Sequence, residues 1–154
     1  FRNQIRPRPL AFLLGQVRTG WTPECRLLGV TLNVRASDWN AVVSVDEQSV
    51  IAGLTGAMVA TLGVLGQADG AAITLDAVAS GGELRHIDVV QDEVFVAPGI
   101  SGRFFDATWG DRPGGWFAGL GAATAKAVAQ QHGGEVVFLV GERHGSTVRL
   151  QFTR

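Results

Sequence analysis

Residues 48–68 contain no charged side chain, and this stretch constrains the fold more than any other part of the chain. Its larger residues recur at the spacing of helical turns, which predicts one long helix with an apolar stripe. The stripe consists of Val50, Ile51, Leu54, Ala57, Met58, Thr61, Leu62 and Leu65. The opposite face is also uncharged and consists of Ala52, Gly53, Thr55, Gly56, Val59, Ala60 and Gly63. Asp46 stands where an N-cap is expected, and the second face predicts that a sheet, a ligand or a partner covers it.

A membrane-spanning helix is the alternative for this stretch, because its length would suffice to cross a bilayer. Its glycines (Gly53, Gly56, Gly63 and Gly66) and the amide side chains at its ends, Gln48 and Gln67, argue against that alternative. The one-sided rhythm of large residues is typical of a helix packed in a core. We therefore expect a core helix and no direct membrane contact by this chain.

Size and composition bound the other possibilities. A chain of 154 residues suits one domain with a single core, so we expect one domain over residues 1–154. The 13 basic and 14 acidic residues nearly balance, so the composition does not indicate nucleic-acid binding. A lone Cys25 excludes an internal disulfide and fits a reducing compartment, so we expect a cytoplasmic location. Because the chain begins with Phe1, we expect it to be part of a longer protein.

Hydrophobic periodicity predicts the remaining elements. The expected helices are 10–17, ending at a turn over residues 21–23, and 119–131; the expected strands are 30–35 and 43–45 around a turn, 71–78 and 84–91 as a hairpin, 135–140, and 147–152. Strands clustered as hairpins with helices between them predict an α+β two-layer sandwich. We expect a mixed, largely antiparallel sheet with about three helices on one face.

Residues 92–117 show no periodicity and carry glycines, prolines and the aromatic residues Phe104, Phe105, Trp109 and Trp116. A connection of this length inside a compact domain is usually functional, and we expect a lid-like loop. Its aromatic residues either fill the core, occupy a ligand pocket or dock a partner helix.

A glycine-containing helix start, Gly119-Leu120-Gly121, points to a nucleotide site, because backbone N–H groups there can approach a phosphate. Close helix packing is the alternative role for these glycines. His132 precedes Gly133, where a histidine interacts well with the helix dipole, so we expect a structural role for it. No histidine has cysteine or carboxylate neighbours at ligand spacing, so we expect no metal site.

Three motifs near the end of the chain occur in one order. They are Gly119-Leu120-Gly121-Ala122-Ala123-Thr124-Ala125-Lys126, His132-Gly133-Gly134, and His144-Gly145-Ser146-Thr147. Together with Phe104-Phe105 they resemble the ATP-binding catalytic domain of two-component sensor histidine kinases, a fold shared with gyrase B. The resemblance implies that Gly119, Leu120, Gly121 and Thr147 line the phosphates and that Asp92 or Gln91 lies at the adenine.

The first half of the chain departs from this family. Ala60 stands where the family has the asparagine that holds Mg²⁺, and Gly56 stands where the family has a second asparagine. Gln91 stands in the place of the adenine-binding aspartate, and Phe117 replaces a glycine. A neutral hydrogen bond contributes about 0.5–1.5 kcal/mol, against roughly 1.5–3 for a charged one. The resemblance therefore implies weak or absent ATP binding, doubtful Mg²⁺ binding, and no assigned catalytic residue.

These observations predict a pseudokinase domain of two-component signalling. Its implied partner is a helical dimerisation and phosphoacceptor domain or a response regulator. One alternative is an active ATP-dependent histidine kinase domain whose motifs have diverged. The other is a protein-interaction module that does not use a nucleotide.

Overall fold

The computed structural model describes residues 4–66, 70–106 and 109–153. The helices are α1 (Leu10–Leu27), α2 (Glu47–Leu65) and α3 (Gly115–Gln131), with a short 3-10 helix at Pro98–Ile100. The strands are β1 (Arg6–Pro9), β2 (Thr31–Ala36), β3 (Val42–Val45), β4 (Ala72–Ser80), β5 (Glu83–Gln91), β6 (Val136–Val140) and β7 (Ser146–Gln151).

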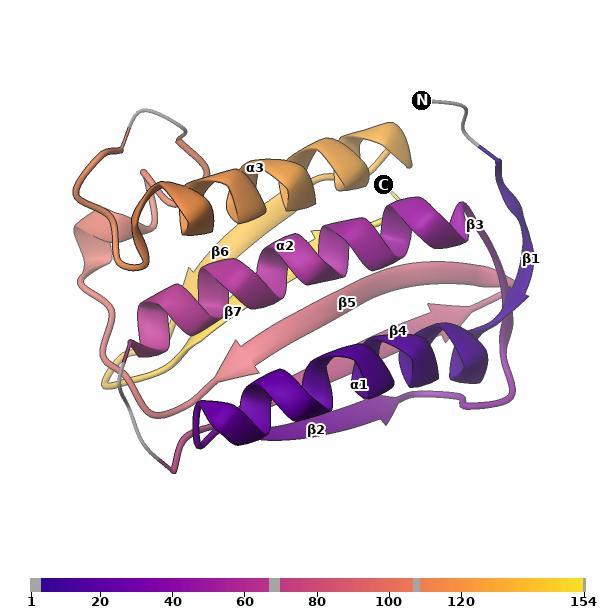
Figure 1. The fold of residues 1–154 in the computed structure, drawn as a ribbon. Coiled ribbons are helices and arrows are strands. Elements are labelled where there is room, and N and C mark those ends of the chain that lie inside the picture. Colours follow the sequence, from indigo (N-terminus) through magenta and orange to yellow (C-terminus); the bar gives the residue numbers. More distant parts are fainter. Residues whose placement is uncertain (1–3, 67–69, 107–108, 154) are drawn as a thin grey trace.

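Five strands form the main sheet in the order β2-β4-β5-β7-β6, and β1 pairs with β3 in a separate two-stranded sheet. Only the β2–β4 pair of the main sheet is parallel. Three helices lie side by side across one face of this sheet, with α2 between α1 and α3 (Figure 1). The expected α+β two-layer sandwich is therefore confirmed.

Strands β2 and β3 correct one expectation, because they do not pair around a turn. Val34 of β2 pairs with Leu75 of β4, and Val43 of β3 pairs with Arg8 of β1. Strand β1 was not expected, since its sequence Arg-Pro-Arg-Pro lacks strand signals. Proline is tolerated there because an edge strand needs few backbone donors.

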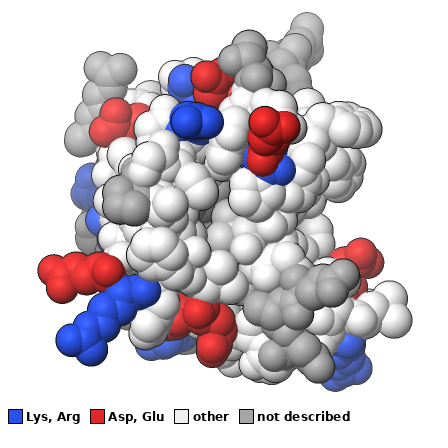
Figure 2. All heavy atoms as spheres, turned by 90° about the vertical axis from the view of Figure 1, so that its left-hand side faces the viewer, with Lys and Arg blue, Asp and Glu red and all other residues white. Residues whose placement is uncertain are grey.

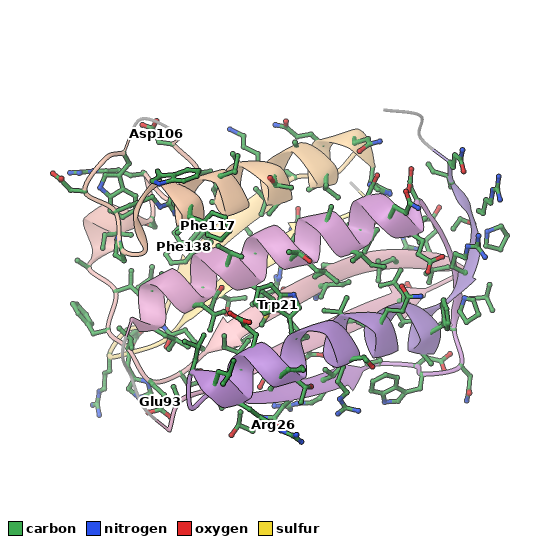
Figure 3. All side chains as sticks on the ribbon, viewed as in Figure 1. Trp21, Arg26, Glu93, Asp106, Phe117 and Phe138 are labelled. Carbon is green, nitrogen blue, oxygen red and sulfur yellow. The ribbon has the colours of Figure 1, made fainter. Side chains whose placement is uncertain are left out.

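Helix α1 continues past the expected turn and contains Pro23. Thr22 donates its hydroxyl to the carbonyl oxygen of Arg18 at 2.7 Å. Trp21 projects from α1 toward α2 (Figure 3), and Cys25 is buried one turn later. Packing of this last part of α1 therefore outweighs the helix-breaking effect of proline. Burial raises the pKa of the Cys25 thiol, so that thiol is not activated.

The β4–β5 hairpin forms as expected, on the two-residue turn Gly81-Gly82. Both glycines have positive φ, 60° and 76°, which matches the turn that suits two-residue hairpins. Helix α3 begins four residues earlier than expected, at Gly115 rather than Gly119. It ends at a cap in which Gly133 has φ 83° and Gly134 N–H donates to the Ala129 carbonyl oxygen at 2.9 Å.

Helix α2 is the central core helix. Its length and composition would allow a membrane span. However, 56% of the 18-residue stretch that could form such a span is buried inside the domain. Val50, Leu54, Ala57 and Met58 are completely buried. These contacts are those of a core helix, as expected; residues 67–68 of the uncharged stretch lie outside the described part of the chain.

Candidate functional site

The surface between α2 and α3 is formed by backbone rather than by large side chains. A Cβ atom on Gly56 would overlap the carbonyl oxygen of Gly121, and one on Gly121 would meet the carbonyl oxygen of Gly56. A Cβ on Gly53 would lie 2.9 Å from Cγ1 of Val128. We call Gly53, Gly56 and Gly63 the glycine seam of α2. Helix α3 is therefore what covers the small, uncharged face of α2.

Ala60 lies inside this contact. It is one turn from both Gly56 and Gly63, on the same face of α2, and it is completely buried. A Cβ on Gly63 would lie 2.9 Å from the carbonyl oxygen of Pro113, so the seam extends to the start of α3. The position at which the resemblance places a metal ligand therefore holds a buried methyl group on the face of α2 that α3 covers.

The residues expected to line the phosphates point in different directions. Gly121 is packed against α2, whereas Gly119 faces the side chain of Arg112, whose Cδ would lie 3.2 Å from a Cβ at that position. Leu120 is exposed. The structure therefore does not direct these three residues toward a common point.

Gln91 is completely buried at the end of β5, and its amide group bonds to the protein itself. Its Nε2 donates to the carbonyl oxygen of Val94 at 3.0 Å and to Oγ of Ser146 at 3.1 Å. Its Oε1 accepts the N–H groups of Glu93 and Val94, each at 2.9 Å. The Gln91 amide thus fixes the turn that follows β5, and both ends of the amide are occupied.

Asp92 and Thr147, the two other predicted residues at this end of the sheet, lie near Gln91 but are not among the hydrogen-bond partners of its side chain. Asp92 is exposed in the turn after β5, beside Gly145. Ser146 and Val148 of β7 face the helices and are buried. Since side chains alternate along a strand, Thr147 faces the open side of the sheet. Sequence reasoning missed Ser146, because its role depends on the β5–β7 pairing.

Phe104 anchors the segment between β5 and α3. It is buried and stacked on Phe138 of β6, with ring centroids 3.9 Å apart, and Phe105 meets it edge-on at 5.1 Å. Figure 3 places Phe138 below the start of α3. Of the alternatives for the aromatic residues, Phe104 fills the core, whereas Trp116 is 78% exposed.

Arg112 is the most unusual residue of this region, and sequence reasoning missed it. It is buried, and its Nη1 donates to the carbonyl oxygen of Phe104 at 2.8 Å. Its guanidinium carbon lies 5.2 Å from the centroid of Phe104 and 5.1 Å from that of Trp109. Burial lowers the pKa of its guanidinium. The only sequence signal was a cation placed between tryptophans.

His132 and Asp46 join α2 to α3 at the other end of the seam. His132 Nδ1 bonds to the carbonyl oxygen of Val128 at 3.0 Å, and its Nε2 accepts the Asp46 N–H at 3.3 Å. Asp46 also caps α2 by accepting the Ser49 N–H at 3.2 Å. Burial by itself would raise the pKa of the Asp46 carboxyl, but N–H donors from Gln4 and Ser49 lower it below its ordinary value. These contacts support the structural role expected for His132.

The end of the molecule that carries α3's first turn has its charged side chains mainly around the edge (Figure 2). Figure 2 shows Lys, Arg, Asp and Glu around the edge of this view and an uncharged middle. The described residues contain no group of three or more His, Cys, Asp or Glu side chains able to hold a metal ion. The site therefore offers backbone, aromatic and amide groups, together with Arg112.

Comparison with solved structures identifies the fold. The nucleotide-free catalytic domain of the histidine kinase ThkA superposes with a TM-score of 0.77 at 12% identity, over 97% of both chains. Full-length ShkA in complex with AMPPNP superposes with a TM-score of 0.73 at 22% identity, over 97% of this chain and 31% of ShkA. The mycobacterial sensor histidine kinase MprB gives 0.66 at 13% identity, over 94% of both chains.

No protein-family profile matches the chain, and no curated protein matches its sequence. The structural likeness nevertheless extends over nearly the whole chain. The protein therefore has the fold of the catalytic domain of histidine kinases.

Proposed function

We propose that this chain is the ATP-binding-type domain of a sensor histidine kinase, that it has lost productive nucleotide binding, and that it acts in the cytoplasm by docking. The observation that carries the proposal is the direct contact between Gly56 and Gly121 with Ala60 buried beside it. Residues 1–154 form its single domain, and residues 92–117 correspond to the lid.

Phosphoryl transfer depends on positioned phosphates and on Mg²⁺ to neutralise their charge. Mg²⁺ requires oxygen ligands in a near-octahedral arrangement. Ala60 and Gly56 supply no side-chain oxygen, and the helix contact leaves no space between Gly56 and Gly121. Both observations support the proposed loss of metal binding on this face of α2.

The adenine position supports the same proposal. A carboxylate at Gln91 could accept a hydrogen bond from a base, but the amide that replaces it already bonds to Val94, Glu93 and Ser146. A nucleotide would have to displace those bonds. Asp92 remains available only at the exposed end of the turn.

Docking is supported by the first turns of α3, where Trp116, Phe117 and Leu120 are all exposed. Exposed aromatic clusters are typical of protein-binding surfaces. ThkA, in complex with the response regulator TrrA, superposes with a TM-score of 0.69 at 11% identity, over 98% of this chain and 42% of ThkA. A response regulator or a helical phosphoacceptor domain is accordingly the proposed partner.

Thermal unfolding with ADP, ATP and Mg²⁺ tests the loss of the nucleotide site. A ligand at 100 times its dissociation constant stabilises a protein by about 2.7 kcal/mol, which raises the melting temperature of a domain of this size by roughly 5–10 °C. We expect no shift with millimolar nucleotide. A saturable shift would contradict the loss of nucleotide binding, and phosphorylation of a helical acceptor domain from labelled ATP would establish the active-kinase alternative.

A further inference from the structure

Arg112 is a buried cation that no described carboxylate neutralises. Only 5% of its surface is exposed, and the ion pairs among the described residues do not include it. One guanidinium nitrogen donates to Phe104, while Nε has no hydrogen-bond partner. Buried ions are normally paired, because removing a charge from water is costly. The surroundings of Arg112 therefore favour an anion.

Two aromatic rings fix the orientation of this guanidinium. Its central carbon lies over the Phe104 and Trp109 rings at 5.2 and 5.1 Å. Such contacts offset part of the cost of burial, but ring faces do not accept hydrogen bonds as a carboxylate does. A guanidinium stacked on rings keeps its N–H donors at its edge, which is the geometry that recognises planar oxyanions.

A pocket of about 290 Å³ adjoins Arg112. Its walls include Arg112, Trp109, Trp116, Gly119, Leu120 and Ala123. Gly119 and Ala123 lie about 200° around α3 from Gly121, so the pocket faces away from α2 and from the glycine seam. Its volume lies just below the range of about 300–1,000 Å³ for small-molecule sites. That space suits a molecule with one ring and is too small for a nucleoside triphosphate.

We propose that this pocket binds a small aromatic oxyanion, with the anion at Arg112 and the ring against the indoles of Trp109 and Trp116. The Arg112 guanidinium favours a negatively charged ligand, and the two tryptophans favour a ligand with a flat apolar ring. The missing side chain of Gly119 gives Arg112 the space to lie against α3. This site does not depend on the proposed loss of nucleotide binding, but it shares Trp116 and Leu120 with the proposed docking surface.

Isothermal titration at constant ionic strength tests the proposal with three probes: benzoate, phenyl phosphate and benzamide. Benzoate and phenyl phosphate distinguish a carboxylate from a phosphate ester, and benzamide has the shape of benzoate without its charge. We expect saturable binding of at least one anion, and at least tenfold weaker binding of benzamide. Losing one charge-assisted hydrogen bond weakens binding by roughly ten- to hundredfold, so Arg112→Gln should lower anion affinity by that factor.

Arg143→Gln is the matched control, because Arg143 is an exposed arginine in the connection between β6 and β7. It should bind the anions as the unaltered protein does. Equal binding of benzoate and benzamide, unchanged affinity in Arg112→Gln, or no saturable heat up to about 10 mM anion would overturn the proposal. If Arg112→Gln does not fold, the comparison of benzoate with benzamide on the unaltered protein still decides the question.

Discussion

At Gly56 the Cβ of an added methyl group would lie too close to the Gly121 carbonyl oxygen, so the close approach of α2 to α3 depends on the absence of that group. Overpacking a well-packed contact costs roughly 1–3 kcal/mol. We expect Gly56→Ala to lower the free energy of unfolding by at least that amount, measured by urea denaturation.

Gly15→Ala is the control for this substitution. Gly15 is also helical, but a Cβ there would have no neighbour within 4 Å. Because alanine favours a helix over glycine, Gly15→Ala should stabilise the domain by roughly 0.5–1 kcal/mol. Equal stability of Gly56→Ala and the unaltered protein would show that the two backbones are not in contact.

Asp46 gives the domain a defined acid sensitivity. Its hydrogen bonds lower the folded-state pKa of the carboxyl below the unfolded value of about 3.9. The unfolded chain therefore binds the proton more readily, and the stability from this group is complete above that pH and lost as the pH falls through the folded pKa. We expect Asp46→Asn to be less stable than the unaltered protein at pH 7, with the difference shrinking below about pH 4. Urea titrations at pH 7, 5 and 3 measure this; a difference that grows at low pH would contradict it.

Roles that depend on neighbours in the sequence were predictable, whereas roles that depend on residues brought together by the fold were not. Asp46 as a cap and Gly133 at the helix end follow from their immediate neighbours. Arg112, by contrast, meets Phe104 only because the connection before α3 folds back on itself. Ser146 meets Gln91 through a strand pairing across more than fifty residues, which no local pattern encodes.

At the scale of elements, the long uncharged helix and the β4–β5 hairpin were predictable because each has its own periodicity and turn chemistry. The separation of β2 from β3 was not, because a parallel pairing with β4 requires the chain to cross over the sheet through β3 and α2. The length of α1 was underestimated, since its last part depends on tertiary packing rather than on helix propensity.

Pro23 is exposed, so its effect on α1 is separable from packing. Proline inside a helix removes one backbone hydrogen bond and crowds the preceding turn. Restoring that bond should outweigh the roughly 0.4–1 kcal/mol by which proline stiffens the unfolded chain. We expect Pro23→Ala to raise the free energy of unfolding by roughly 1–2 kcal/mol, with increased helical circular dichroism. Pro7→Ala, in an edge strand, should not increase the helical signal; a destabilised Pro23→Ala would mean that α1 depends on the proline itself.

At the scale of the whole molecule, the exposed side chains of Trp116, Phe117 and Leu120 lie together on the first turns of α3, at the end of the domain viewed in Figure 2. If that end docks a partner, its largest exposed side chain should contribute strongly. We expect Trp116→Ser to weaken binding to a cognate response regulator or helical phosphoacceptor domain by at least tenfold, a loss of about 1.4 kcal/mol, with an unchanged melting temperature.

Trp39→Ser is the control, because Trp39 is an exposed tryptophan in the connection between β2 and β3. Titration of the isotope-labelled domain with each partner measures the affinity and locates the contact by chemical-shift changes. Equal weakening by both substitutions would place the contact elsewhere.

The glycine seam also bears on how such a domain can change over evolutionary time. An asparagine introduced at position 60 alone would be larger than the completely buried alanine and would add a polar amide there, so we expect the single step to be destabilising. Recovery of metal chemistry would require the helices to separate and the ligands to appear together. Because the two backbones are in contact, each substitution that by itself reintroduces a metal ligand would lower the stability of the domain, and selection for stability opposes it.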